Sequence, residues 1–283
     1  MPILVDYNQV AISNLMVSIN TYNKNAEINE DLIRHMVLNS LRAYKVKFGE
    51  KYGELVICCD GRNYWRKTLF PYYKAGRKRD RTQSGLNWNE IFETLNKIRD
   101  ELKDYFPYKV VDVDTAEADD IIGTIVLNKS PFEPTLILSG DKDFMQLQKI
   151  LNVDQYAPVQ KKFLKTKKAG EFLKEQILRG DRGDGIPNFL SADDVLLSGK
   201  RQTPISTKKL EGWMVSDPED FCDDAMLRGY RRNEQLIDLE CIPDDVSTEI
   251  LEQYSREPAD RSNLFNYFVK HNLKLLMENI QEF

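Results

Sequence analysis

Acidic residues stand repeatedly where an apolar, strand-like run of this chain ends. Three runs end in this way, at Asp6, at Asp60, and at Asp141 with Asp143. In a parallel sheet covered by helices, the carboxyl ends of the strands share one edge, and ligands bind there. The chain is therefore expected to form an α/β fold that gathers carboxylates at one edge of its sheet.

The complete set of candidate site acids has nine members: Asp6, Asp60, Glu117, Asp119, Asp120, Asp141, Asp143, Asp181 and Asp184. So many carboxylates in one place would repel one another unless divalent cations neutralised them. An all-carboxylate donor set in a chain with only two histidines favours Mg²⁺, or Mn²⁺ as its substitute, over zinc. Two such ions would suit the hydrolysis of phosphodiester bonds.

The alternation of strand-like and helical patterns predicts a mostly parallel sheet with helices on both faces. The predicted strands are 3–6, 54–60, 108–113 and 135–139. The predicted helices between them are 28–48, 88–106 and 115–128. Asn29 is the expected N-cap of the first helix, and Asp114 with Glu117 resembles a capping box that opens the third.

The pattern becomes mainly helical after about residue 170, which predicts an α/β domain at 1–180 and a smaller helical region at 181–283. The chain has no glycine-rich nucleotide-binding motif and no apolar run near the ~18 residues of a membrane span. Its beginning also lacks the basic start of a signal peptide. We therefore expect a cytoplasmic protein without membrane contact.

A basic and aromatic segment follows Asp60, in a chain whose net charge is −5. It contains eight cations and five aromatic residues, among them Tyr73; the cations are Arg62, Arg66, Lys67, Lys74, Arg77, Lys78, Arg79 and Arg81. Cations that follow phosphates and rings that stack on bases suit single-stranded nucleic acid. The alternative is a solvated helix with its aromatic residues in the core.

The position of this segment, directly after a site acid, favours the nucleic-acid interpretation. Segment 62–85 is expected to form an arch over the acids. Its mutual charge repulsion and few apolar anchors predict that it is mobile until nucleic acid binds, and that Lys74 and Arg77 approach the site only then. A second basic run is more simply a solvated face; its lysines are Lys161, Lys162, Lys165, Lys167 and Lys168.

Each acidic motif is weak by itself, because acids in a first helical turn often serve the helix dipole. The joint series is more specific, and it resembles the flap endonuclease (5′-nuclease) family. The series comprises Ile3-Leu4-Val5-Asp6, Cys59-Asp60, Tyr73-Lys74 with Arg77, Glu117-Ala118-Asp119-Asp120, Gly140-Asp141-Lys142-Asp143-Phe144, and Gly180-Asp181 through Asp184-Gly185-Ile186-Pro187. The similarity spans nearly the whole chain and is greatest to the branch found in T-even bacteriophages.

This resemblance implies a PIN-like fold, two Mg²⁺ ions among the nine acids, and 5′-to-3′ cleavage at 5′ ends and flaps, with ribonuclease H activity on primers. It gives catalytic roles to Asp120 and Asp141, scissile-phosphate contacts to Lys74 and Arg77, and base stacking to Tyr73. The implied partners are branched or 5′-ended DNA, RNA–DNA hybrids, a single-stranded-DNA-binding protein and a sliding clamp. A monomer in the host cytoplasm is implied for a phage protein.

The sequence departs from the family after Pro187. The family usually continues with a glycine-rich helix–hairpin–helix that holds K⁺ and grips duplex DNA, whereas this chain has Asn188-Phe189-Leu190-Ser191. Duplex contacts in this region therefore cannot be assigned from the resemblance.

Two other classes remain open on the residues alone. A Toprim- or PIN-type metal nuclease also uses a glutamate with an Asp-x-Asp pair, although the basic segment after Asp60 counts against it. A non-catalytic branched-DNA-binding protein would be favoured by missing carboxylates, yet all nine positions are filled. An apolar stripe near the end of the chain either binds a partner or packs on the core; it comprises Leu264, Phe265, Phe268, Leu273, Leu276 and Ile280.

Overall fold

The computed structural model describes residues 1–22, 29–77, 81–82 and 85–283. Six strands form one sheet in the order β3-β2-β1-β4-β5-β6. They are β1 Pro2–Asp6, β2 Glu54–Cys58, β3 Lys109–Val111, β4 Thr135–Leu138, β5 Val153–Ala157 and β6 Lys162–Leu164. The first five are parallel, and β6 pairs with β5 in the antiparallel sense. The expected mostly parallel sheet is confirmed.

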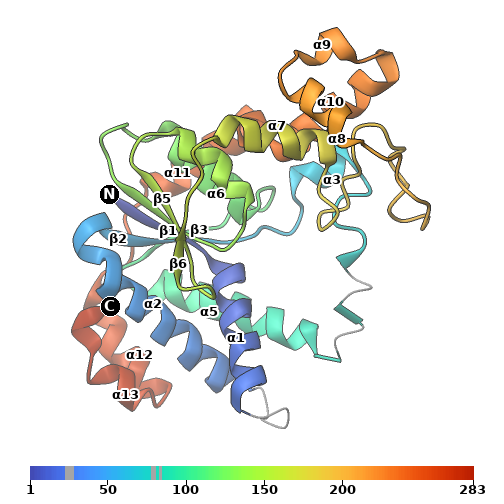
Figure 1. Cartoon of the computed structure of the whole chain (residues 1–283). Helices are drawn as coiled ribbons and strands as arrows, with labels where there is room; N and C mark the ends of the chain where they lie inside the picture. The colour runs from blue at the N-terminus through green and yellow to red at the C-terminus, as the bar shows by residue number, and fades with distance from the viewer. Residues whose placement is uncertain (23–28, 78–80, 83–84) are drawn as a thin grey trace.

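Helices cover both faces of this sheet (Figure 1). The helices of the first two thirds are α1 Tyr7–Tyr22, α2 Glu30–Tyr52, α3 Trp65–Leu69, α5 Trp88–Tyr105, α6 Ala118–Asn128, the 3-10 helix η1 Asp143–Lys149, and α7 Ala169–Arg179. Those of the last third are α8 Thr207–Met214, α9 Pro218–Phe221, α10 Asp224–Ile237, η2 Leu239–Cys241, α11 Asp244–Ser255, η3 Arg261–Asn263, α12 Leu264–Lys270, α13 Lys274–Met277 and η4 Ile280–Glu282.

Successive residues of a strand point to opposite faces, and this alternation separates two apolar clusters. Val5 and Ile57 face the cluster that α1, α2, α5 and α12 complete, whereas Leu4 and Val56 face the cluster of α6 and α11. A third cluster lies away from the sheet and joins α3, α7 and α10 through residues such as Phe70 and Phe189. Residues after 180 contribute to all three clusters, so the division into 1–180 and 181–283 stays a prediction.

Several element boundaries differ from the prediction. The second strand ends at Cys58, and the third is limited to Lys109–Val111. Strands β5 and β6 were missed because β5 carries Asp154 and Gln155 and β6 has only three residues. Asn29 is confirmed as the N-cap of α2, since its side chain accepts the Leu32 N–H at 2.9 Å.

The expected capping box of the third helix was wrong by one turn. Helix α6 begins at Ala118, and Asp120 Oδ2 accepts the backbone N–H of Glu117 at 2.9 Å. Asp114 instead accepts the Asn63 side chain at 2.9 Å. Two neighbouring acid-rich turns offer similar capping patterns, and tertiary packing selects the second.

The apolar stripe near the end of the chain packs mostly on the core. Leu264, Phe268, Leu273 and Leu276 are buried in the cluster that contains α2 and α5. Ile280 is partly buried against the same cluster, and only Phe265, which is 55% exposed, points away from it. The core interpretation of the stripe is therefore confirmed for five of its six residues. No helix in the described part of the chain is long and apolar enough to cross a membrane.

Candidate active site

The carboxyl edge of the sheet carries the candidate site. Asp6 ends β1, Asp60 lies two residues beyond β2, and Asp141 lies three residues beyond β4. Because β2, β1 and β4 are adjacent and parallel, their acids reach the same edge. Helix α6 starts nearby, because Asp60 Oδ1 accepts the Ala118 N–H at 2.8 Å.

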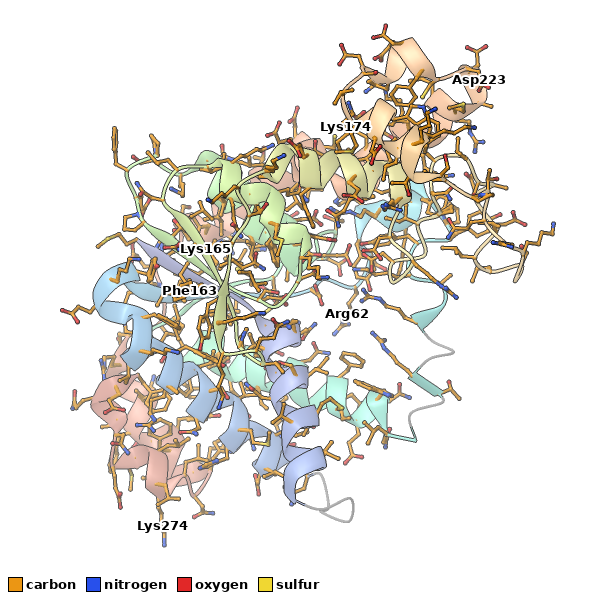
Figure 2. The ribbon with its side chains drawn as sticks, in the orientation of Figure 1. Arg62, Phe163, Lys165, Lys174, Asp223 and Lys274 are labelled. Atoms are coloured by element: carbon orange, nitrogen blue, oxygen red, sulfur yellow. The ribbon has the colours of Figure 1, made fainter. Side chains whose placement is uncertain are left out.

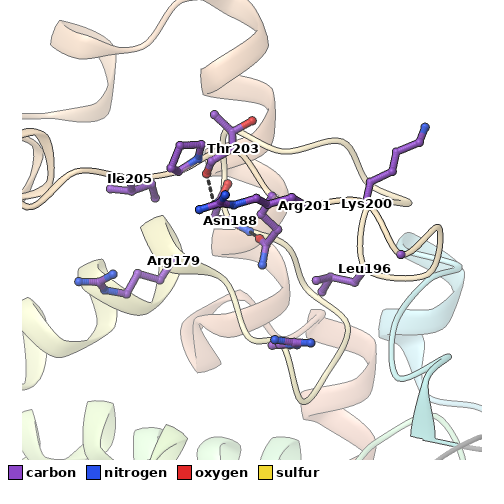
Figure 3. Close-up of a pocket in the computed structure, with 11 residues that line it drawn as sticks. Arg179, Asn188, Leu196, Lys200, Arg201, Thr203 and Ile205 are labelled. Carbon is purple, nitrogen blue, oxygen red and sulfur yellow. Dashed lines mark hydrogen bonds between the residues drawn. The ribbon is translucent and has the colours of Figure 1, made fainter.

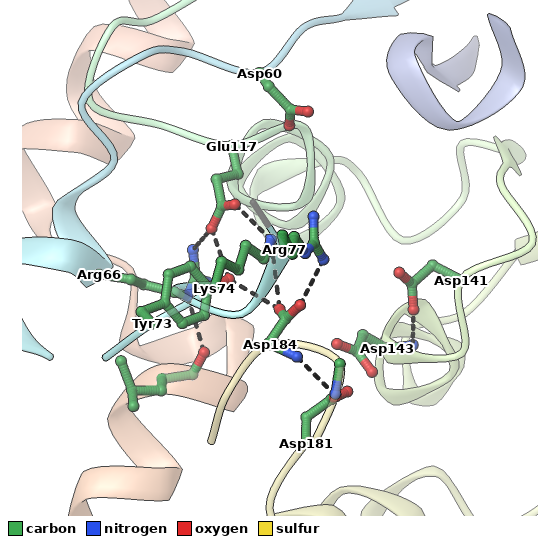
Figure 4. A network of polar contacts seen from close by, with 12 residues as sticks. Asp60, Arg66, Tyr73, Lys74, Arg77, Glu117, Asp141, Asp143, Asp181 and Asp184 are labelled. Carbon is green, nitrogen blue, oxygen red and sulfur yellow. Dashed lines mark hydrogen bonds and ion pairs between the residues drawn. The ribbon is translucent and has the colours of Figure 1, made fainter. Parts of the chain in front are cut away.

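Three of the nine acids are neutralised by cations of the chain, and we call them the paired acids: Glu117, Asp120 and Asp184. Lys74 Nζ lies 2.6 Å from Glu117 Oε1 and 3.4 Å from Asp184 Oδ2 (Figure 4). Arg77 Nη2 lies 2.5 Å from the other oxygen of Asp184. The Tyr73 hydroxyl donates toward both Glu117 and Asp184, at 2.8 and 3.0 Å.

The third paired acid, Asp120, has no exposed surface. Its Oδ1 lies 2.7 Å from Arg66 Nη1, and its Oδ2 caps helix α6. Arg66 also donates to the backbone oxygen of Leu236 at 2.8 Å. The structure therefore separates Asp120 from the open part of the site and gives it a role in joining α3 to α6.

The other six acids have no ion pair within the described residues, and we call them the open acids: Asp6, Asp60, Asp119, Asp141, Asp143 and Asp181. Their partners are neutral donors. Asp60 accepts from Asn8, and Asp6 accepts from Ser139, both at 2.8 Å.

Backbone and amide groups hold the open acids that lie beyond β4 and α7. Asp181 Oδ1 accepts the backbone N–H groups of Gly183 and Asp184, at 2.7 and 3.1 Å. Asp143 accepts from the amide of Gln176 at 2.5 Å. Asp141 lies exposed at the mouth of a hollow that also contains Asp143 and Asp181.

The open acids disturb one another electrostatically. Burial and the neighbouring Asp60 raise the pKa of Asp6 to about 7, and burial and Asp141 raise the pKa of Asp143 to about 7. Burial followed by Asp141 holds the pKa of Asp119 well above its usual value, and desolvation by the protein around its carboxyl group, followed by Asp184 and Asp181, raises the pKa of Asp141. Desolvation and like charges both favour the protonated form of a carboxyl group.

The paired acids behave in the opposite way. Burial alone would raise the pKa of Asp184, but Lys74 and Arg77 lower it below its usual value. Burial would likewise lower the pKa of Lys74, and the attraction of Asp184 and Glu117 raises it instead. An opposite charge within a few ångströms favours the charged form of each partner.

The donor set of the open acids fits divalent metal ions. It consists of carboxylate oxygens, which hard cations such as Mg²⁺ prefer, and its mutual repulsion is of the kind that a cation relieves. Within the described ranges, no three acidic, histidine or cysteine side chains already enclose a metal position. The acids are therefore assembled at one edge without forming a closed cage.

Two of the residues predicted to contact nucleic acid are buried in the structure. Arg66 and Tyr73 are only 2% and 3% exposed, because both turn inward toward the paired acids. Their contact with nucleic acid stays a prediction that would require both side chains to turn outward. Arg62, Lys67, Arg77 and Arg81 are exposed, whereas Lys78 and Arg79 lie outside the described residues.

The expectation of an unanchored arch is wrong for its first part. Phe70 and Tyr73 are buried in the third apolar cluster. The Lys74 backbone N–H donates to the backbone oxygen of Asp184 at 2.7 Å. Lys74 and Arg77 form ion pairs with Glu117 and Asp184. The later part of the arch includes residues 78–80 and 83–84, which lie outside the described residues.

Four side chains that hold the acids were missed in the sequence: Asn8, Ser139, Gln155 and Gln176. The clearest case is Gln155, which is fully buried and donates to the backbone oxygens of Ser139 and Asp141 at 3.1 and 2.5 Å. Ser139 could have been found by its place directly before Gly140-Asp141. Gln176 lies 33 residues from Asp143, and no local pattern connects the two.

Family comparisons agree with this arrangement. Residues 5–176 match the model of the 5′-3′ exonuclease N-terminal resolvase-like domain, and residues 171–283 match the T4 RNase H C-terminal model. The chain belongs to the 5′-3′ exonuclease family. It is therefore a nuclease, and the Toprim alternative is excluded.

Individual relatives support this family assignment. The chain is 34% identical to the ribonuclease H of Enterobacteria phage T4, over 99% of this chain and 95% of that protein. It is 31% identical to a 5′-3′ exonuclease of Streptomyces coelicolor, over 47% of this chain and 50% of that one.

Solved structures of this family share the fold of the chain. The T5 D15 protein co-crystallised with metal ions matches with a TM-score of 0.59 at 15% identity, over 89% of this chain and 98% of that one. The T5 D15 flap endonuclease in a complex with DNA and metal ions matches with a TM-score of 0.60 at 14% identity, over 90% and 99%. These matches show the PIN-like 5′-nuclease fold.

Proposed function

We propose that this 5′-3′ exonuclease family member is a Mg²⁺-dependent nuclease that removes RNA primers and adjacent DNA from 5′ ends and flaps. The observation that carries the proposal is the gathering of six open acids at the carboxyl edge, directly beside the basic segment 62–77. Similarity along the whole chain to the phage T4 ribonuclease H supports the primer substrate. The flap endonuclease title of the T5 structure supports the flap substrate.

The open acids would hold two Mg²⁺ ions, with Mn²⁺ as a substitute. When bound, such ions lower the pKa of a water molecule and neutralise charge on a phosphate. The chain keeps the acids in position with neutral donors, so that their charge remains available to the ions. Glu117 and Asp184 would not hold the ions directly, because their carboxylates are paired with Lys74 and Arg77.

Lys74 and Arg77 would stabilise the charge that develops on the scissile phosphate. Arg77 is suited to this contact, because its side chain is 45% exposed while one nitrogen remains on Asp184. Lys74 is only 9% exposed, so it would have to turn from Glu117 toward the phosphate. The two cations would therefore act at different depths of the site.

The nucleic acid would extend from the acids over cationic surface. Arg62, Lys67 and Arg81 are exposed on the segment of the arch. A hollow of about 510 Å³ in the lobe after α7 adds further cations and would bind duplex phosphates; its lining includes Arg179, Arg182, Lys200 and Arg201 (Figure 3). This lobe would serve in place of the family's usual motif after Pro187.

The remaining parts of the proposal concern context. The substrates would be branched or 5′-ended DNA and RNA–DNA hybrids, and the protein would act as a monomer in the host cytoplasm. A single-stranded-DNA-binding protein and a sliding clamp would recruit it during replication. Residues 1–180 would form the catalytic unit, and 181–283 the helical DNA-binding region.

Cleavage of labelled substrates tests the proposal. A 5′-flap duplex and an RNA–DNA hybrid, each labelled at the 5′ end, are incubated with Mg²⁺, with Mn²⁺ or with EDTA. Short labelled products are expected with either metal and none with EDTA. Cleavage in excess EDTA would contradict the metal requirement, and an uncleaved RNA–DNA hybrid beside a cleaved flap duplex would contradict the primer substrate.

A further inference from the structure

The lysine hairpin, residues 158–168, is a basic surface that the proposed site does not yet use. It connects β5 to α7 and contains β6; its lysines are Lys161, Lys162, Lys165, Lys167 and Lys168. All five are exposed, and the segment contains no acidic residue. Within the described structure only Lys168 forms an ion pair, with Glu171 at 2.9 Å.

The hairpin starts at the same edge of the sheet as the open acids. Strand β5 is parallel to β4, so its end at Ala157 lies beside the loop that carries Asp141. A Cβ atom on Gly140 would lie 4.0 Å from the Cβ of Ala157. Lys162 is the registered partner of Ala157 across the antiparallel pair, one strand spacing of ~4.8 Å further out.

The order of the strands places the acids between two basic segments. Strand β2 leads into the arch, β1 and β4 supply Asp6 and Asp141, and β5 leads into the lysine hairpin. Figure 2 shows Phe163 and Lys165 on the hairpin, with Arg62 of the arch well apart from them. A nucleic-acid strand that left the arch and crossed the acids would therefore reach the hairpin next.

An exposed aromatic ring accompanies the lysines. Phe163 is 41% exposed, and its ring is fixed edge-on against Phe48 and Tyr156, with centroids 6.0 and 5.2 Å away. Lys47 Nζ lies 4.3 Å from the Tyr156 ring and adds positive charge to the same side. A ring held in place beside several lysines is a surface on which a base can stack.

We propose that the lysine hairpin binds the sugar-phosphate backbone of the substrate, on the side of the scissile phosphate opposite to the arch. The proposal rests on the nuclease function proposed above. Lys161 and Lys162, which lie at the acid edge beside Ala157, would contact phosphates, and Phe163 would contact a base. The spacing of ~10 Å between the acids and the hairpin corresponds to about three nucleotides, at 3.4 Å per nucleotide of a duplex strand.

A competing explanation is that the lysines protect an edge strand. Strand β6 is the edge of the sheet, and lysines on edge strands prevent pairing with a second chain. This explanation predicts aggregation when the lysines are replaced, without any change in the affinity of the monomer for nucleic acid. It does not require an exposed ring beside the lysines or a position at the acid edge.

The test is a double charge reversal, Lys161→Glu with Lys162→Glu, compared with a matched reversal at Lys270 and Lys274. Both control residues are exposed, and Figure 2 shows Lys274 at the far end of the molecule. Binding of a fluorescent 5′-flap DNA is measured by anisotropy in EDTA over a range of salt concentrations. The hairpin variant should bind about tenfold more weakly, and its salt slope should fall by about 1.8, or 0.9 for each lost phosphate contact.

Cleavage kinetics separate this proposal from the proposed function. In Mg²⁺, the hairpin variant should show a raised KM and a kcat within about twofold of the parent, because the metal site is untouched. Failure of the parent to cleave the flap DNA in Mg²⁺ would overturn the proposed metal and substrate. A cleaving parent with equal Kd values for the hairpin and control variants would overturn only the hairpin proposal.

Substrates of different lengths locate the contact. The arms of the flap DNA are shortened one at a time. For the arm that reaches the hairpin, the hairpin variant and the parent should have equal Kd values once the arm is too short to reach it. A Phe163→Leu variant, which keeps apolar packing on Phe48, should weaken binding of the long-arm substrate only. Equal losses for all arm lengths would show a general charge effect and contradict the proposal.

Discussion

The open acids and the paired acids lie at one edge of the same sheet, yet they are neutralised in different ways. Glu117, Asp120 and Asp184 form ion pairs with lysine or arginine side chains of the chain. The open acids accept hydrogen bonds only from neutral donors among the described residues. Burial and like charges raise the pKa of Asp6 and Asp143 to about 7, while Lys74 and Arg77 lower the pKa of Asp184. The difference separates acids that join parts of the fold through ion pairs from acids that have no counter-charge among the described residues.

The paired acids also connect distant parts of the chain. Arg66 and Lys74 come from the segment after β2, Glu117 and Asp120 from the start of α6, and Asp184 from the loop after α7. A buried ion pair contributes little net stability compared with apolar packing, but the removal of one partner is costly. These pairs therefore fix where the basic segment lies relative to the open acids.

The largest effect is expected for an open acid. Asp141→Asn should reduce kcat about 10⁴-fold, or ~5.4 kcal/mol of transition-state stabilisation, because it removes a charged ligand from the proposed metal site. Its stability should be unchanged or increased, since a repulsive charge is lost. Single-turnover cleavage and urea unfolding of the same variant measure both quantities. Turnover within about tenfold of the parent would exclude Asp141 as a metal ligand.

A paired acid should show its main effect on stability. Asp120→Asn leaves Arg66 buried without its closest counter-charge, which should cost about 3–4 kcal/mol of unfolding free energy. Urea unfolding with constant m-values measures this cost. The double variant Asp120→Asn with Arg66→Met should recover a large part of it, because no buried charge then remains unpaired. If the Asp120→Asn variant were as stable as the parent but inactive, Asp120 would have to be counted with the open acids as a proposed metal ligand.

Sequence reasoning located the acids correctly but could not sort them. Residues at the ends of apolar runs are visible in the sequence, because strand and helix patterns are local. The partner of a carboxylate is not local: Arg66 meets Asp120, and Lys74 meets Glu117 and Asp184, only after the chain has folded. For the same reason the buried positions of Arg66 and Tyr73 were missed.

The fold shows the same limit. The apolar strands β1 to β4 and the helices α2, α5 and α6 were predicted to within a few residues, whereas α1, which directly follows β1, was missed. Strand β6 has only three residues, and it forms because Leu164 and Phe163 find Gln155 and Tyr156 on β5. Such a strand depends on its neighbour and leaves no periodic pattern of its own.

Lys74 tests how the paired acids are held. Lys74→Met should cost about 2 kcal/mol of stability, because Glu117 and Asp184 lose a buried cation while Arg66 and Arg77 remain near them. Urea unfolding and cleavage kinetics should be compared with Lys67→Met on the exposed side of the same segment. A Lys67→Met variant as unstable as Lys74→Met would show that the burial of Lys74 is unimportant.

The open acids should make stability depend on pH. Asp6 and Asp143 protonate near pH 7 in the folded protein and near pH 4 in the unfolded chain. Between these values the folded state binds more protons, so stability should fall as pH rises, by at most about 1.4 kcal/mol per pH unit for each group. Urea unfolding from pH 4 to 8 in EDTA measures the fall. Millimolar Mg²⁺ and the Asp143→Asn variant should each flatten the curve, and a parent profile that rises over this range would contradict the assignment.

Arg77 is expected to give the smallest change in stability and so marks the outer limit of the paired group. Its guanidinium lies against Asp184, but its side chain is 45% exposed, so water already solvates much of its charge. Arg77→Met should therefore change the unfolding free energy by about 0–1 kcal/mol, the usual range for an exposed ion pair. The same variant should lower kcat/KM for the flap substrate if the guanidinium contacts the scissile phosphate, and Arg77→Lys should restore part of that loss. A large loss of stability with unchanged cleavage would make Arg77 a structural cation like Arg66. In that case the exposure of a cation in the site would not predict its role.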